Sequence, residues 1–150
     1  MKLLIVYHTQ SGHTERLAQA ALAGARQVGE VQTDIRRAFD TRLEHLLAAD
    51  GLLIGTPENF GTMSGAIKDL FDRTYYPAEG LMTGRPYAVF VSAGNDGRGA
   101  HAQIDRIALG YGWKKVHDGL IVRGEPAAAD LVAAEELGMT LAAGMSCGIF

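Results

Sequence analysis

Short apolar runs alternate with longer amphipathic segments along the whole chain. Four runs are continuously apolar: LLIV (3–6), LLI (52–54), AVFV (88–91) and LIV (120–122). Because the strands of a parallel sheet are covered on both faces, continuous runs of this length predict parallel strands. A fifth segment, VQTDI (31–35), alternates polar and apolar residues, which predicts a strand at the edge of the sheet.

The segments between these runs carry apolar residues at helical spacing. Residues three, four and seven apart share one face of a helix, so each set predicts an amphipathic helix with one buried side. A shorter helix is expected near residues 41–49. The four longer segments are marked by Leu17, Ala21, Ala25 and Val28, by Met63, Ile67, Leu70 and Phe71, by Ile104, Ile107, Ala108 and Tyr111, and by Leu137 and Leu141.

Strands and helices that alternate in this way predict a doubly wound α/β fold with three layers, α/β/α. The second strand is the edge-type one, which suits the order 2-1-3-4-5 better than 3-2-1-4-5, an order with longer half-repeats. We expect five parallel strands in a single domain over residues 1–150, because a chain of this length has room for one core.

Composition and charge limit the kinds of binding partner and the cellular compartment that we expect. With 14 basic and 17 acidic residues the net charge is −3, so no basic surface for nucleic acid or anionic lipid is expected, and small molecules or proteins remain. Cys147 is the single cysteine, which excludes an internal disulfide and favours a reducing cytoplasm. The first apolar run is too short for a signal peptide or membrane insertion. The histidines lack metal-ligand spacing, and no metal is expected.

Ligands of doubly wound sheets bind beyond the carboxyl ends of the strands, where the strand order reverses. Three loops reach that edge, at residues 8–14, 56–62 and 92–100. The first, HTQSGHT, leads into a helix, whose N-terminal amides and dipole favour an anion. Its hydroxyl residues and its glycine suit a phosphate, with His13 as a further donor. Ordinary N-capping by Ser11 or Thr14 is the alternative.

Other phosphate-binding folds require residues that this chain lacks. A dinucleotide fold needs G-x-G-x-x-G after the first strand and a P-loop needs G-x-x-x-x-G-K-[ST], and neither pattern is present. A magnesium-binding receiver domain needs acidic residues after the first and third strands, where this chain has Tyr7 and His8, then Thr56 and Pro57. These classes are therefore excluded.

Two stretches resemble a known family. YHTQSGHTERLA (7–18) is similar to the FMN-phosphate loop of the flavodoxin superfamily, [ST]-x-[ST]-G-x-T, and GTPENFGTMSGAIKDLFDRT (55–74) resembles the third-strand loop and helix of its NAD(P)H:quinone reductase and FMN reductase branch. The resemblance implies a flavodoxin-like fold, bound FMN and NAD(P)H as a transient electron donor. It implies a phosphate site of Thr9, Gln10, Ser11, Gly12, His13 and Thr14, a ring site of Pro57, Glu58, Asn59, Phe60, Gly61 and Thr62, and a third flavin loop with Ser92, Ala93, Gly94, Asn95 and Gly97.

The chemistry of a flavin makes similar demands on the protein. The ring needs a flat apolar slot, donors for its pyrimidine carbonyls and a backbone group near N5. Phe60 suits the cover of the ring, and Gly61 allows close approach of the backbone. The alternatives are a hydrophobic staple for Phe60 at the start of the next helix, a flexible loop for the glycines of 92–100, and a solvated charge pair for Asp96 and Arg98.

The resemblance implies an enzyme, an FMN-containing and NAD(P)H-dependent reductase of quinones, flavins or similar acceptors. Because the flavin carries the redox chemistry, no side chain is expected to act as a catalytic acid or base. The main alternative is a flavodoxin that carries single electrons between proteins, and another is a flavin-binding module without turnover. Loop 92–100 has no aromatic residue, which favours the reductase. A homodimer is left open, and segment 75–86, which lacks a clear helical pattern, is expected to pack against the sheet edge.

Overall fold

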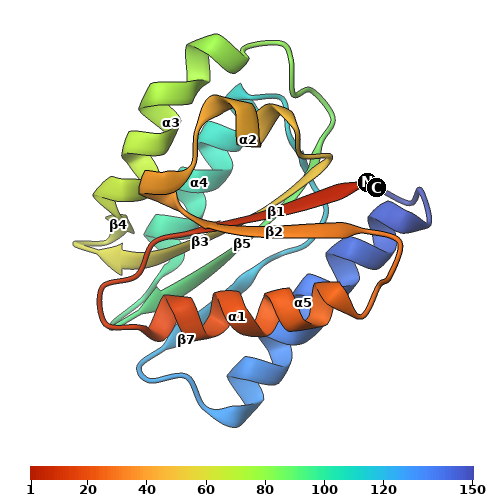
Figure 1. The fold of residues 1–150 in the computed structure, drawn as a ribbon. Coiled ribbons are helices and arrows are strands. Elements are labelled where there is room, and N and C mark those ends of the chain that lie inside the picture. Colours follow the sequence, from red (N-terminus) through yellow and green to blue (C-terminus); the bar gives the residue numbers. More distant parts are fainter.

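A parallel sheet lies at the centre of the computed structural model, which describes residues 1–150 (Figure 1). Its order is β2-β1-β3-β5-β6, and β7 pairs with β5 further along that strand. With β6 and β7 together as the fifth strand, the order 2-1-3-4-5 is confirmed. The parallel strands are β1 (Lys2–Tyr7), β2 (Gln32–Arg37), β3 (Gly51–Asn59), β5 (Pro86–Ala93), β6 (Lys114–Lys115) and β7 (Leu120–Arg123).

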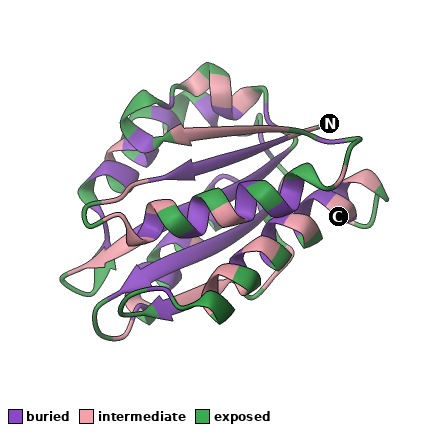
Figure 2. Cartoon of the chain, turned by 60° about the horizontal axis from the view of Figure 1, so that its bottom comes forward, coloured by how far each residue is buried: buried purple, intermediate pink, exposed green.

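Helices cover both faces of the sheet, as the alternation of elements predicts (Figures 1 and 2). One face is covered by α1 (His13–Arg26) and α5 (Ala128–Ser146). The other is covered by the short α2 (Leu43–Leu47), by α3 (Gly65–Ala78) and by α4 (Arg98–Gly110), with a 3-10 turn, η1 (Ala38–Asp40), after β2. None of these helices combines the length and apolar character that a membrane crossing requires.

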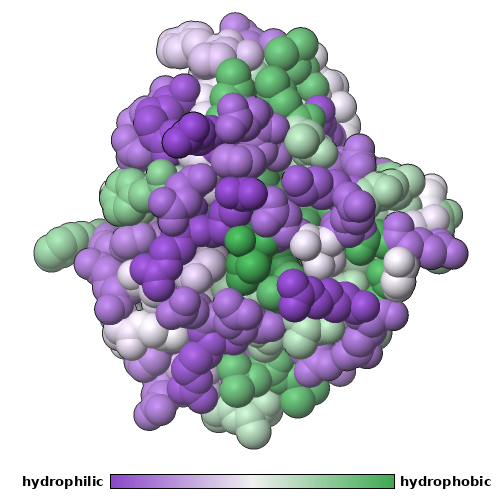
Figure 3. Space-filling model, in the orientation of Figure 1, coloured by the Kyte–Doolittle hydropathy of each residue, from purple (hydrophilic) through white to green (hydrophobic).

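The two cores on either side of the sheet explain the continuous apolar runs. Side chains of successive strand residues point to opposite faces, so Leu3 and Ile5 of β1 join the core under α1 and α5. Leu4 and Val6 join the core under α3 and α4. All four side chains are fully buried, whereas hydrophilic residues cover much of the outer surface (Figure 3).

The helices α1 and α5 cross at unusually close range because two glycines lie at the crossing. A Cβ atom added at Gly138 of α5 would overlap the carbonyl group of Ala21 in α1. A Cβ added at Gly24 of α1 would overlap the carbonyl group of Glu135 in α5. The small residues therefore let the two backbones touch, and α1 is held in place by α5.

The fifth strand is interrupted, which the sequence did not predict. Residues 116–119 separate β6 from β7, and Gly119 adopts a left-handed φ of 87°. The buried imidazole of His101 lies against Gly119, where a Cβ atom would overlap its Nε2. A glycine is needed here because both the backbone angle and the space exclude a side chain.

The prediction that segment 75–86 lies outside a helix is wrong for its first four residues. The helix α3 continues through Tyr75 to Ala78, with Pro77 in its last turn. The aromatic ring of Tyr75 packs edge-on against Tyr111, with 5.1 Å between centroids, and Ala78 is fully buried. Tertiary packing of this turn outweighs the helix-breaking tendency of the proline, which acts less strongly at a helix end.

Candidate functional site

The loop between β1 and α1 presents a row of unpaired donors. Gly12 is the N-cap of α1 with a left-handed φ of 92°, and no side chain caps the helix. The Thr9 hydroxyl accepts a hydrogen bond from the Gly12 N–H at 3.0 Å, which tightens the turn. The backbone N–H groups of the neighbouring residues have no acceptor within the chain: Gln10, Ser11, His13, Thr14 and Glu15. The capping alternative is therefore wrong, and the loop keeps its donors for a ligand.

A cluster of charged and phenolic groups flanks this loop. The Tyr7 hydroxyl donates to the Glu15 carboxylate at 2.9 Å, and the Arg37 guanidinium lies 3.3 Å from the same carboxylate oxygen. Burial, together with the hydrogen bond to Glu15, raises the pKa of Tyr7. Arg37 thus offsets the negative charge of Glu15 in the first turn of α1, where an anionic ligand would otherwise be repelled.

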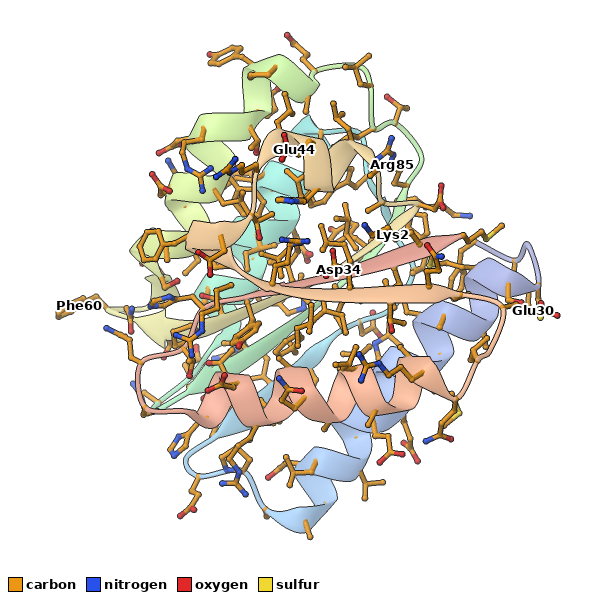
Figure 4. The ribbon with its side chains drawn as sticks, in the orientation of Figure 1. Lys2, Glu30, Asp34, Glu44, Phe60 and Arg85 are labelled. Atoms are coloured by element: carbon orange, nitrogen blue, oxygen red, sulfur yellow. The ribbon has the colours of Figure 1, made fainter.

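The second predicted loop is a hairpin rather than an irregular loop. The strand β3 continues to Asn59 and pairs antiparallel with β4 (Thr62–Met63). Phe60 and Gly61 form the turn, with φ angles of 53° and 76°. A left-handed φ is costly for a bulky residue, and Phe60 is nevertheless fully exposed at the tip of the hairpin (Figure 4).

The exposure of Phe60 also excludes its alternative role as a hydrophobic staple. A hydrophobic staple would need Phe60 to pack on the first turn of α3, but its side chain is fully exposed. The helix α3 begins instead with Ser64 as N-cap, whose hydroxyl accepts from the Ile67 N–H at 3.4 Å. The staple interpretation is wrong, and the aromatic side chain is free at the rim of the site.

The third loop connects β5 to α4 and is held by the hairpin. Gly97 is the N-cap of α4 with a left-handed φ of 82°, and no side chain of its own loop caps the helix. The Glu58 carboxylate accepts from the N–H groups of Asp96, at 3.3 Å, and Gly97, at 2.5 Å. The first turn of α4 also touches the hairpin tip, because a Cβ at Gly99 would overlap the Gly61 carbonyl oxygen. The two loops therefore form one unit.

A hollow of about 620 Å³ opens between these two loops. Its size is within the usual range of small-molecule sites. Phe60 is the only large apolar residue in its lining, so its walls are mostly backbone and short side chains. The N–H groups of Gly94, Asn95 and Gly99 have no acceptor within the chain. The lining residues are Glu58, Phe60, Gly61, Gly94, Asn95, Asp96 and Gly99.

Two arginines neutralise the acidic group beside this hollow. The Asp96 carboxylate accepts from the Arg98 side chain at 2.7 Å and lies 3.6 Å from the Arg123 guanidinium. The hydrogen bond from Arg98 lowers the pKa of Asp96. All three groups are partly or largely exposed, as expected for a solvated charge cluster.

Comparison with known families identifies the chain. The model of the family described as NADPH-dependent FMN reductase matches residues 38–126, more than half of the chain. The chain belongs to this family of FMN reductases. FMN is therefore the cofactor and NAD(P)H the electron donor, as the sequence resemblance implies. Oxidoreductase chemistry follows from the same membership.

The relatives of this chain carry two kinds of name. An NAD(P)H dehydrogenase (quinone) of Acidithiobacillus ferrooxidans is 31% identical over 146 residues, which cover 83% of this chain and 71% of that protein. A flavodoxin of Aquifex aeolicus is 30% identical over 140 residues, covering 83% and 76%. The structure of a flavodoxin from the domain Archaea superposes with a TM-score of 0.85 at 22% identity, over 97% of this chain and 99% of that one, which shows a shared fold.

The fold brings the predicted loops to one edge of the sheet, since β1, β3 and β5 are parallel neighbours. Glu58, Phe60, Gly61, Gly94 and Asn95 line the hollow. Several other predicted residues belong to the strands that support the loops and do not line the hollow. Pro57 pairs with Ser92 in the sheet, and Ser92 and Ala93 are buried within β5, while Asn59 and Thr62 pair at the end of the hairpin.

Three residues near the site were missed by the sequence prediction. Asp96 and Gly99 line the hollow but were not assigned to it. Arg37 ends β2 directly opposite Tyr7 of β1 in the parallel register. Because parallel strands end at the same edge, the predicted pairing of the first two strands is a signal that could have placed this arginine beside the loop after β1.

Proposed function

We propose that this chain is an FMN-containing enzyme that transfers electrons from NAD(P)H to quinones, flavins or similar small acceptors. The observation that carries the proposal is the open hollow beside the hairpin, lined by short side chains and unpaired backbone donors. When bound, FMN supplies the redox chemistry, and the protein supplies binding, orientation and electrostatics. We propose that it works in the cytoplasm, where its single cysteine stays reduced.

The loop after β1 is proposed to bind the phosphate. Unpaired amides lie at the N-terminus of α1, where the helix dipole favours an anion; they belong to Gln10, Ser11, His13, Thr14 and Glu15. The Ser11 and Thr14 hydroxyl groups add donors, and open space lies around Gly12, where an added Cβ would meet no atom within 4 Å. His13 lies at the first position of the helix and adds a further donor.

The hairpin and the loop after β5 are proposed to hold the ring. The free N–H groups of Gly94, Asn95 and Gly99 suit the carbonyl oxygens of a pyrimidine edge. Loop 94–97 contains no aromatic residue, and the exposed Phe60 packs on nothing within the chain. One face of the ring is thus left accessible, which a nicotinamide needs in order to stack during hydride transfer.

A second candidate function is that of a flavodoxin, an electron carrier between proteins. It is favoured by the relative from Aquifex aeolicus, which is named a flavodoxin and is nearly as similar as the quinone dehydrogenase. The accessible ring face and the weak net charge of −3 argue for the enzyme, because a carrier covers its ring and docks through a charged surface.

The test is a spectral titration of the FMN-loaded protein without oxygen. We expect NADH or NADPH to bleach the visible flavin band in one step, and a quinone to restore it over repeated cycles. Phe60→Ala should keep the bleaching, because the exposed side chain is not needed to hold the loops together. If neither nicotinamide bleaches the flavin, while dithionite reduces it in two separate one-electron steps, the enzyme proposal is wrong and the carrier takes its place.

A further inference from the structure

Glu58 makes contacts that a simple flavin ligand would not make. It lies on the hairpin, and both of its carboxylate oxygens are used by backbone N–H groups of the loop after β5. Oε1 accepts from Asp96 and Oε2 accepts from Gly97. The two donors are 38 and 39 residues away in sequence, so the contact joins separate elements. The carboxylate also borders the hollow between the hairpin and the loop.

We propose that Glu58 is a positioning residue: its carboxylate holds loop 94–97 against the hairpin and thereby sets the width of the ring pocket. This inference rests on the proposed function, since the hollow is taken as the site of the flavin ring. It assigns to Glu58 a role through the loop, in place of direct contact with the ring.

The need for a carboxylate follows from the start of α4. Gly97 is left-handed and has no side chain, so the loop offers no capping group of its own. The Glu58 carboxylate on the hairpin therefore serves as the hydrogen-bond acceptor that the N-terminus of α4 lacks. A negative charge is favourable there because of the helix dipole. The nearby Asp96 carboxylate is paired with Arg98 and Arg123, which reduces its repulsion of Glu58.

A second contact supports the same unit. The Gly61 carbonyl oxygen occupies the place that a Cβ atom of Gly99 would take, so only a glycine lets helix and hairpin lie this close together. The hydrogen bonds of Glu58 hold the loop after β5 against the hairpin, and the Gly61–Gly99 contact limits how closely α4 and the hairpin approach. The gap between them is thus defined from both sides, and the free N–H groups of Gly94, Asn95 and Gly99 are held at its edge.

The first test uses Glu58→Gln without any flavin. The amide oxygen of glutamine can accept one N–H, but its NH₂ group faces the other donor, so one contact is lost. Amide hydrogen exchange at Asp96 and Gly97 should become roughly tenfold faster or more, as expected for a lost hydrogen bond to a charged group. Exchange in the middle of β5 should stay unchanged, which separates a local opening from unfolding. The control is Glu136→Gln, an exposed residue of α5.

The second test measures the affinity of the same variants for FMN and riboflavin by fluorescence titration. Glu58→Gln should weaken both flavins by the same factor, roughly tenfold, because it disturbs the ring pocket and leaves the phosphate loop intact. Glu58→Asp, which keeps a shorter carboxylate, should recover part of both the exchange protection and the affinity.

Unchanged exchange at Asp96 and Gly97 in Glu58→Gln would overturn the proposal, and a fall in flavin affinity would then mean direct contact with the ring. Faster exchange with unchanged affinity for riboflavin would also overturn it, since the loop would not shape the pocket. If the wild-type protein binds neither flavin, the proposed function fails, and the exchange rates still decide whether Glu58 holds the loop.

Discussion

Thr14 offers the sharpest test of the proposed phosphate loop. Its side chain is 1% exposed at the start of α1, yet its hydroxyl does not cap the helix. Thr14→Val removes the hydroxyl and keeps the branched shape, so the packing under the loop should survive. We expect the substitution to weaken FMN binding and to leave riboflavin binding unchanged, because riboflavin has no phosphate.

The size of the effect depends on how far Thr14 and Ser11 are each exposed to water. A hydrogen bond to a charged group contributes about 1.5–3 kcal/mol, and a buried donor belongs to the upper part of that range. The loss for Thr14→Val should therefore be about 2–3 kcal/mol, or roughly 30- to 150-fold in Kd. Ser11 is exposed, so water competes for its hydroxyl, and Ser11→Ala should cost about 1.5 kcal/mol, or roughly tenfold.

Fluorescence titration of the apoprotein with each flavin measures both effects. Thr140→Val is the matched control, since Thr140 is an exposed residue on α5. Equal weakening of FMN and riboflavin by Thr14→Val would refute the assignment of the loop, because the hydroxyl would then act on the ring or on the fold. An unchanged FMN affinity would refute it as well.

Three further predictions concern stability. Gly138→Ala should lower the free energy of unfolding by about 1–3 kcal/mol, because the added methyl group forces α1 and α5 apart; urea denaturation measures this, and an unchanged midpoint would contradict the close crossing. Phe60→Gly should raise stability by about 1 kcal/mol through relief of the left-handed strain, and a loss of stability would show that the exposed ring has an unrecognised contact. Burial raises the pKa of Tyr111 to about 12, so the folded state keeps the phenolic proton at a pH where the unfolded state, with the ordinary tyrosine pKa of 10.0, has lost it. Stability should therefore fall as pH rises from 10.0 to about 12, and the slope should be smaller in Tyr111→Phe; equal slopes in denaturation curves would contradict this.

The layers of the fold could be predicted from the sequence because a strand that is buried on both faces is continuously apolar. Leu3 and Ile5 serve one core and Leu4 and Val6 the other, so the run LLIV could hardly be anything but a central strand. The edge strand showed its position through alternation, and it does lie at the edge. These properties depend on local pattern alone, which is why the strand order followed.

The parts that escaped prediction depend on contacts between distant residues. Nothing near Glu58 in sequence indicates that its carboxylate binds the amides of Asp96 and Gly97. The hairpin was hidden because its turn places Phe60, not asparagine or glycine, at the first left-handed position. The break at residues 116–119 depends on His101 from another element, which only the assembled fold brings to Gly119.

The close crossing of α1 and α5 also bears on how the protein matures during synthesis. The helix that begins at the proposed phosphate loop packs against residues 128–146, so part of this face of the sheet stays uncovered until α5 has left the ribosome. Domains fold as units during synthesis, at about 5–20 residues per second. We therefore expect the nascent chain to acquire its flavin late, after translation of α5, and stalled chains that lack this helix to remain colourless.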